Sequence, residues 1–216
     1  MPVVDIFDEV EEELRAERAR QAWRRFGPLL VVGLLLVLGG VAGWQGYGWW
    51  KNRQAQTSAM AFLNAQTAGE GATPADQAAR FASLAAQSPT GYRTLARLRA
   101  AAFQAEAGER NTARATLDQV TNDTDADPLY RDLANLLWVL HGLDDVDPAV
   151  LAARITPLTG EGSAWRASAR ELAALVELRR GRPAEAKRAL EALANDATAP
   201  QGVRERALRL SRSIEG

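Results

Sequence analysis

An apolar run near the N-terminus decides how the rest of the chain is interpreted. Residues 26–50 contain no Asp, Glu, Lys, Arg or His. As a helix this run would reach roughly 37 Å, and about 20 apolar residues are enough to cross the hydrocarbon core of a bilayer. A helix on the surface of a soluble domain shows a polar face, which this run lacks. The sequence therefore predicts a transmembrane helix over residues 26–50.

Aromatic residues border the predicted span. They are Trp23 before it, and Trp44, Tyr47, Trp49 and Trp50 at its end. Indole and phenol rings prefer the headgroup layer, so these residues are expected at the membrane interfaces. A buried core helix and a signal peptide cleaved near residues 41–43 are the alternatives. A long charged segment before the run and its continuation through the aromatic residues both oppose cleavage.

Positive charge sets the predicted orientation. Five arginines precede the span within residues 15–25, whereas only Lys51 and Arg53 follow it closely. The side richer in Lys and Arg normally stays in the cytoplasm. Residues 1–25 are therefore expected in the cytoplasm and residues 51–216 in the periplasm, with the span in a bacterial inner membrane.

The cytoplasmic segment has the pattern of an amphipathic helix. Ile6, Val10 and Leu14 are spaced four residues apart, and Gly27-Pro28 is expected to break this helix from the span. The helix would serve either to set topology or to dock a partner. Within the span, Gly39 and Gly43 form a small-xxx-small pattern that would let another helix pack closely.

Beyond the span, helical patterns alternate with short turns. Several turns place Pro after a residue suited to capping a helix: Thr73-Pro74, Ser88-Pro89, Asp127-Pro128 and Asp147-Pro148. No window shows the alternation of a strand. The expected helices cover residues 52–67, 74–87, 91–107, 111–120, 128–141, 148–156, 163–180, 183–195 and 200–213. The predicted fold is all-α.

The helices repeat with a recognisable period. Gly108, Gly142 and Gly181 each close a first helix, and their separations are 34 and 39 residues. In the 34-residue register Leu117 matches Leu151, Ala100 matches Ala134, and Phe103 matches Leu137. This period is that of tetratricopeptide (TPR) repeats, helix pairs that stack into an α-solenoid because none buries its apolar face alone. A generic helical bundle is the alternative.

One repeat departs from the TPR pattern. The helix before Gly108 carries Arg97 and Gln104 where large apolar residues are favoured. If the register holds, Leu136, Val139 and Leu175 would contribute to a concave protein-binding face. Ordinary core packing is the alternative interpretation of these three residues.

The sequence offers little chemistry. It has no Cys, which removes disulfides, thiolate metal sites and thiol nucleophiles, and its net charge of −1 gives no reason to expect nucleic-acid binding. His141, the only His, is typical of a cap or a packed residue. Asp123, Asp125 and Asp127 alternate as in a calcium loop, but the Gly and distal Glu of such a loop are missing. We expect no catalytic, cofactor or metal site and no small-molecule substrate.

The overall layout resembles that of a known family. A short N-terminal helix with the sequence DIFDEVEEELRAERARQAWRRFGP, a span ending in Trp-rich sequence, the continuation WWKNRQAQTSAMAFLNA and divergent helix pairs resemble the YfgM family, in particular its alphaproteobacterial members. That family is the ancillary subunit of the SecYEG translocon. The resemblance implies a membrane-anchored, non-enzymatic protein that works beside the PpiD chaperone on newly translocated proteins.

The sequence therefore predicts three segments: a cytoplasmic helix over residues 1–25, a transmembrane helix over 26–50 and a periplasmic TPR-like domain over 51–216. Its expected function is protein–protein interaction at the Sec translocon. A structural adaptor of another inner-membrane or cell-envelope complex is one rival. A hydrolase that uses Asp and Glu residues in a deep pocket is the other.

Overall fold

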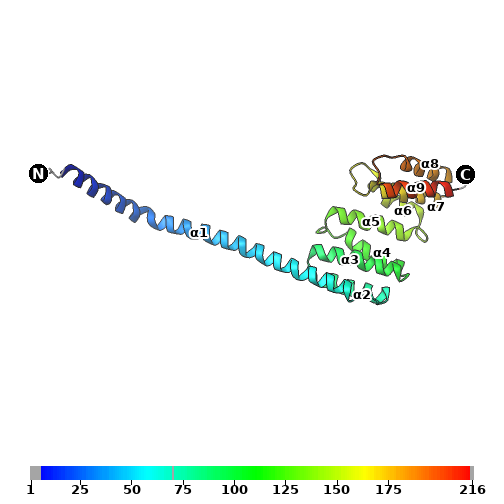
Figure 1. Ribbon diagram of the computed structural model, residues 1–216, viewed down its shortest axis with the longest axis horizontal. Helices are drawn as coiled ribbons and strands as arrows, with labels where there is room; N and C mark the ends of the chain where they lie inside the picture. Colours follow the sequence, from blue (N-terminus) through cyan, green and yellow to red (C-terminus); the bar gives the residue numbers. More distant parts are fainter. Residues whose placement is uncertain (1–5, 70, 215–216) are drawn as a thin grey trace. The chain divides into compact units, whose positions relative to one another are not determined.

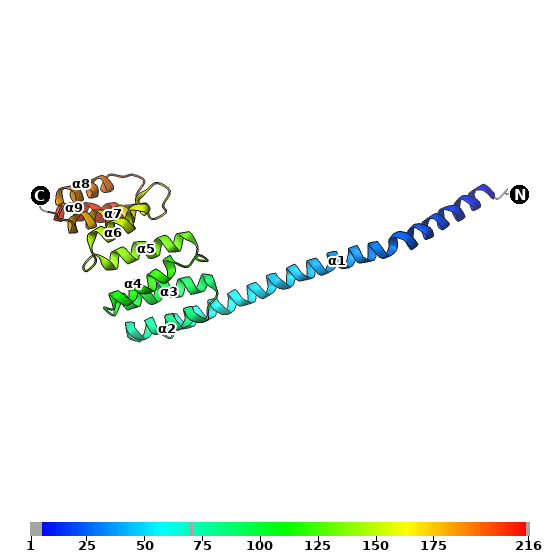
Figure 2. The same cartoon turned by 180° about the vertical axis from the view of Figure 1, so that it is seen from behind.

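The computed structural model describes the backbone of residues 6–69 and 71–214, and their side chains apart from residues 6–32, Leu34 and Asn52. All regular elements in these ranges are helical (Figures 1 and 2). They are α1 (Ile6–Thr67), α2 (Pro74–Gln87), α3 (Thr90–Glu106), α4 (Arg110–Thr121), α5 (Pro128–Gly142), α6 (Pro148–Ile155), the 3-10 helix η1 (Thr156–Thr159), α7 (Arg166–Arg179), α8 (Pro183–Ala194) and α9 (Gln201–Ser213). The predicted all-α fold is confirmed.

Helix α1 belongs to both of the compact units into which the chain divides, residues 1–56 and residues 57–216. The break predicted at Gly27-Pro28 is wrong, because α1 runs through this dipeptide. Proline removes one backbone N–H and crowds the preceding turn, but the helix can continue on either side of it. Here Arg24 and Arg25 before the dipeptide and Leu29 and Leu30 after it supply helical propensity.

The predicted span is described only in part. Residues 26–32 and Leu34 lie outside the described side chains. Among the residues that the structure does describe, we find no helical stretch that is both long and apolar enough to cross a membrane. The transmembrane helix and the orientation derived from it therefore stay predictions.

The starts of the helices follow from local capping. Thr73 accepts a hydrogen bond from the Asp76 N–H at the start of α2, while Asp127 and Asp147 cap α5 and α6 in the same way. Each of these residues satisfies one of the N–H groups that a helix start leaves without a partner. The prediction for Ser88 is wrong: it ends α2 as its C-cap, and Pro89 precedes the first residue of α3.

The repeat period is visible in the packing. Shifting the α3–α4 pair by 73 residues superposes its sequence on the α7–α8 pair: α4 maps onto α8, and both α3 and α7 then end at the same position. Gly108 and Gly181 occupy equivalent turns with φ of 82° and 73°, a left-handed conformation that glycine adopts without a steric penalty. Gly142 instead is the last residue of α5.

Small and apolar residues form the core between successive helices. Buried pairs at the 73-residue spacing are Ala96 and Ala169, Ala101 and Ala174, Ala113 and Ala186, Leu117 and Leu190, and Ala134 and Ala207. Alanine at these places lets neighbouring helices approach closely. Contacts run from α2 to α3, α4 and α5, then through α6 and η1 to α7, α8 and α9. The described residues between 57 and 214 therefore form a stack of helix pairs with a continuous core.

Ion pairs reinforce contacts between elements of this stack. Arg114 of α4 binds both carboxylate oxygens of Asp145, at 2.6 and 2.8 Å. Arg206 of α9 binds both oxygens of Glu171 on α7, at 2.9 and 2.8 Å. Two-pronged guanidinium–carboxylate pairs fix relative orientation, so they specify how one helix lies against another.

Candidate protein-binding surface

Two of the three residues predicted to line a concave face, Leu136 and Val139, are buried in the core. Leu136 is 8% exposed and Val139 is fully buried, and both belong to one hydrophobic cluster with Leu151 and Val176. Leu175 is half-buried against the same cluster. The structure thus favours core packing, which was the alternative interpretation of these three residues.

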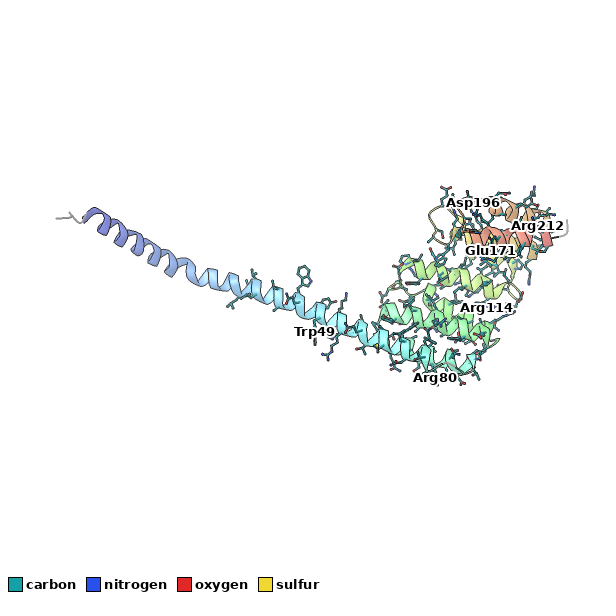
Figure 3. All side chains as sticks on the ribbon, in the orientation of Figure 1. Trp49, Arg80, Arg114, Glu171, Asp196 and Arg212 are labelled. Atoms are coloured by element: carbon teal, nitrogen blue, oxygen red, sulfur yellow. The ribbon has the colours of Figure 1, made fainter. Side chains whose placement is uncertain are left out.

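The aromatic residues of the predicted interface are exposed on α1. Trp44 is 80% exposed, and Tyr47, Trp49 and Trp50 are each more than half exposed (Figure 3). Trp23 lies outside the described side chains. Cations flank this group, with Lys51 Nζ 5.4 Å from the Tyr47 ring and the Arg53 guanidinium 5.0 Å from the Trp49 ring.

The glycines predicted to pack a second helix face open space. A Cβ atom built on Gly39 or Gly43 would meet no atom within 4 Å. This leaves room for another helix but does not identify one.

An open hollow lies over α3, between α2 and α4, with a volume of about 540 Å³. Its lining consists of Ala82, Ala85 and Ala86 of α2, Arg93, Arg97, Ala100 and Gln104 of α3, and Thr116 and Gln119 of α4. Gln104 accepts a hydrogen bond from the Thr116 hydroxyl at 2.8 Å, which fixes the Gln104 side chain in the lining of the hollow. We call this space the α3 hollow.

A second hollow, of about 470 Å³, lies over α7, between η1 and α8. It is lined by Thr159 of η1, Arg170, Ala173, Ala174 and Glu177 of α7, and Ala189, Ala192 and Leu193 of α8. Six lining positions match those of the α3 hollow at the 73-residue spacing, among them Arg97 with Arg170 and Ala100 with Ala173. We call it the α7 hollow, and the two are the same structural feature in different repeats.

In the helix pair between them, the equivalent place is filled by the chain itself. Trp138 of α5 stands 34 residues after Gln104. Its indole N–H donates to Asp118 of α4 at 3.1 Å, and the Arg154 guanidinium of α6 lies 4.1 Å from its ring. The indole of Trp138 thus lies between α4 and α6. In the same way, the α3 hollow lies between α2 and α4, and the α7 hollow lies between η1 and α8.

Each hollow has an Arg–Asp pair at one end. Arg97 Nη1 lies 2.8 Å from Asp123 Oδ2, and Arg170 Nη1 lies 3.5 Å from Asp196 Oδ2. Arg93 also reaches Asp123, at 3.2 Å. In the α3 hollow the guanidinium groups of Arg93 and Arg97 therefore share the half-buried carboxylate of Asp123. The other acid near Arg93, Asp125, lies 3.8 Å away and is largely exposed.

The sequence of residues 20–211 matches the family model described as a tetratricopeptide repeat-like domain. The chain belongs to this family. No curated protein and no solved structure shows significant similarity to the chain. Tetratricopeptide repeat-like domains are typically interaction modules without catalytic activity, so the family supports binding of protein partners.

Within this tetratricopeptide repeat-like domain, Asp123 is held in its charged form. Burial alone would raise the pKa of Asp123. The hydrogen bond from the Asp125 N–H and the positive charges of Arg93 and Arg97 outweigh burial, so the pKa lies below its ordinary value. Asp123 is therefore a structural anion that orders the end of the α3 hollow.

Asp196 behaves in the same way. The Thr198 hydroxyl and N–H donate to Asp196, and together with Arg166 and Arg170 they lower its pKa against the opposing effect of burial. The turns after α4 and α8 thus use one device, an Asp that accepts the N–H two residues later and faces the arginine of its hollow.

These two carboxylates predict acid sensitivity. A folded-state pKa below the unfolded value adds stability that is complete above the unfolded pKa of about 3.9 and is lost as pH falls through the folded pKa. We expect the melting temperature of the chain to fall below about pH 4. The double variant Asp123→Asn/Asp196→Asn should melt lower at pH 7 and show a shallower fall. The exposed turn variant Glu161→Gln is the control, and equal slopes in all three proteins would contradict this role.

Two acids of the acidic turn have structural roles, and the histidine is uncharged at pH 7. Asp123 binds arginines and Asp127 caps α5, which accounts for two acids of the calcium-like pattern. Among the described residues no group of three or more His, Asp or Glu side chains could hold a metal ion. The pKa of His141 is lowered by burial and then by Arg110 and Arg114, so this imidazole is neutral at pH 7.

The hollows were missed from the sequence, although a signal for one was present. Arg97 and Gln104 depart from the apolar pattern of a TPR first helix, and both line the α3 hollow. Polar residues at positions that normally fill the space between helices leave that space open.

Proposed function

We propose that this protein is a single-span inner-membrane protein of the YfgM type, whose periplasmic repeat domain binds other proteins beside the Sec translocon. The observation that carries the anchor is the run of residues 26–50 without a charged side chain. The family match to a tetratricopeptide repeat-like domain supports the binding role of the remainder. The resemblance of the first sixty residues to the YfgM family supports the location.

Exposed apolar side chains on α1 support the anchor. The aliphatic residues Leu35, Leu36, Val37, Leu38 and Val41 are each at least half exposed, ahead of the four exposed aromatic residues. Such a surface on a soluble protein favours association, whereas in a bilayer it contacts lipid. The nearby Lys51 and Arg53 would then meet the headgroups, where indole rings also prefer to lie.

The partner we propose is the export channel with its PpiD-like chaperone. A domain held at the outer mouth of that channel would meet each polypeptide as it emerges. Stacked repeats suit this task because they present a long surface to an extended chain. No enzyme chemistry enters the proposal.

In-membrane crosslinking tests this function. A photo-crosslinking amino acid placed at exposed Arg80 of α2, or at exposed Arg212 of α9, is expected to capture translocon subunits or the chaperone in intact cells (Figure 3). A crosslinker in the predicted cytoplasmic segment, at residue 5, serves as the control and should not capture the chaperone. Recovery of another envelope complex in place of any translocon subunit would favour the structural adaptor and would contradict the proposal.

A further inference from the structure

We propose that the α3 and α7 hollows each bind an aromatic side chain of an extended partner polypeptide. The inference rests on the proposed function, since it presumes that this domain binds protein. It adds that the bound segment carries aromatic side chains. Occupancy of the two hollows would place two anchor points for one polypeptide on the same stack of repeats.

Trp138 shows which occupant suits this place in the repeat. Its indole lies between the guanidinium of Arg154, at 4.1 Å, and that of Arg114, at 5.8 Å. The ring N–H donates to Asp118. The space between two successive second helices can therefore hold an aromatic ring between cations, because the chain itself holds one there.

The two hollows lie at the corresponding place in the neighbouring repeats, and each is also lined by arginine, here from its own helix α3 or α7. Gln104 and Glu177 stand where Trp138 stands, and the small Ala100 and Ala173 leave space beneath. Volumes of about 540 and 470 Å³ fall within the range of ligand-binding pockets, about 300–1,000 Å³. Each hollow could take an aromatic side chain together with part of its backbone.

Charge complementarity selects an aromatic side chain over other kinds. The face of an aromatic ring is negative, so it attracts the guanidinium groups of Arg93 and Arg97 in one hollow and of Arg170 in the other. An acidic side chain would have to compete with Asp123 or Asp196, which already pair with these arginines. An aliphatic side chain would fill the space but would gain nothing from the cations.

Protein-observed NMR tests this binding directly. The full chain is prepared in mild detergent with ¹³C-labelled alanine methyl groups and titrated with N-acetyl-tryptophanamide. Shifts are expected at Ala82 and Ala173, which line the two hollows and are accessible to solvent, but not at the fully buried Ala186, which lines neither. N-acetyl-leucinamide should bind about two- to fivefold more weakly, because it lacks the cation–π contribution. N-acetyl-aspartamide should cause no shift at either hollow.

Variants that plug one hollow at a time complete the test. Gln104→Trp places an indole where the neighbouring repeat has its own, so it should abolish the shift at Ala82 and leave that at Ala173. The matched control Glu106→Trp, exposed on the same helix, should change neither. If Gln104→Trp does not fold, Ala86→Phe, exposed in the same hollow, replaces it. Ala189→Phe, also exposed, should block the α7 hollow alone.

The outcomes separate this inference from the proposed function. Absence of shifts at both alanines, equal binding of the tryptophan and leucine probes, or shifts that survive the plugs would overturn it. Crosslinks to the translocon would persist in that case and leave the proposed function standing. Loss of those crosslinks with intact aromatic binding would instead mean that the domain binds such segments elsewhere in the envelope.

Discussion

Replacing Phe81 by alanine is expected to lower the free energy of unfolding of the repeat domain by about 3–5 kcal/mol. Phe81 of α2 is fully buried. Its ring meets Phe62 edge-on, with the ring centres 5.3 Å apart, and stacks on Phe103 at 5.7 Å. The substitution removes both aromatic contacts and leaves a cavity at the junction of three helices, which neighbouring alanines are too small to fill.

Urea denaturation followed by circular dichroism at 222 nm measures this loss. The control Leu63→Ala lies on α1 one residue from Phe62, but its side chain is 54% exposed, so it should change stability by less than about 0.5 kcal/mol. A loss below about 1 kcal/mol for Phe81→Ala would mean that the terminal turns of α1 do not pack on the domain as described.

Much of the fold could be predicted because it depends on local capping residues and on a periodic spacing of turns, both of which are visible in the sequence. Proline after Thr73, Asp127 or Asp147 marks a helix start through the hydrogen bond that the capping side chain accepts. The spacing of Gly108 and Gly181 marks the period, since both turns need the same left-handed conformation. The prediction that Ser88 caps the start of a helix is wrong because Ser88 is the C-cap of α2. The connection to α3 is so short that Pro89 already precedes the first residue of that helix.

The binding surface could not be predicted in the same way, because it depends on contacts between repeats. Leu136 and Val139 have the composition of either a groove or a core, and only the packing of α5 against α6 and α7 assigns them to the core. The hollows depend on partners far apart in sequence, such as Arg97 with Asp123. The sequence shows that Arg97 and Gln104 depart from the apolar pattern of a TPR first helix, but it does not show which space between helices stays open as a result.

Placing two charges in the apolar run is expected to release the protein from the membrane. In the variant Leu36→Arg/Leu38→Arg, both arginines lie near the centre of residues 26–50, where each raises the free energy of insertion by about 2.5–3.5 kcal/mol. The loss of about 5–7 kcal/mol should exceed what this glycine-containing span retains. Fractionation of cells, with a carbonate wash of the membranes, should then find the variant in the supernatant. The uncharged control Leu36→Met/Leu38→Met should stay with the wild type in the pellet. If carbonate extracts the wild type as well, α1 lies on the membrane surface or outside it, and the anchoring proposal fails whatever the repeats bind.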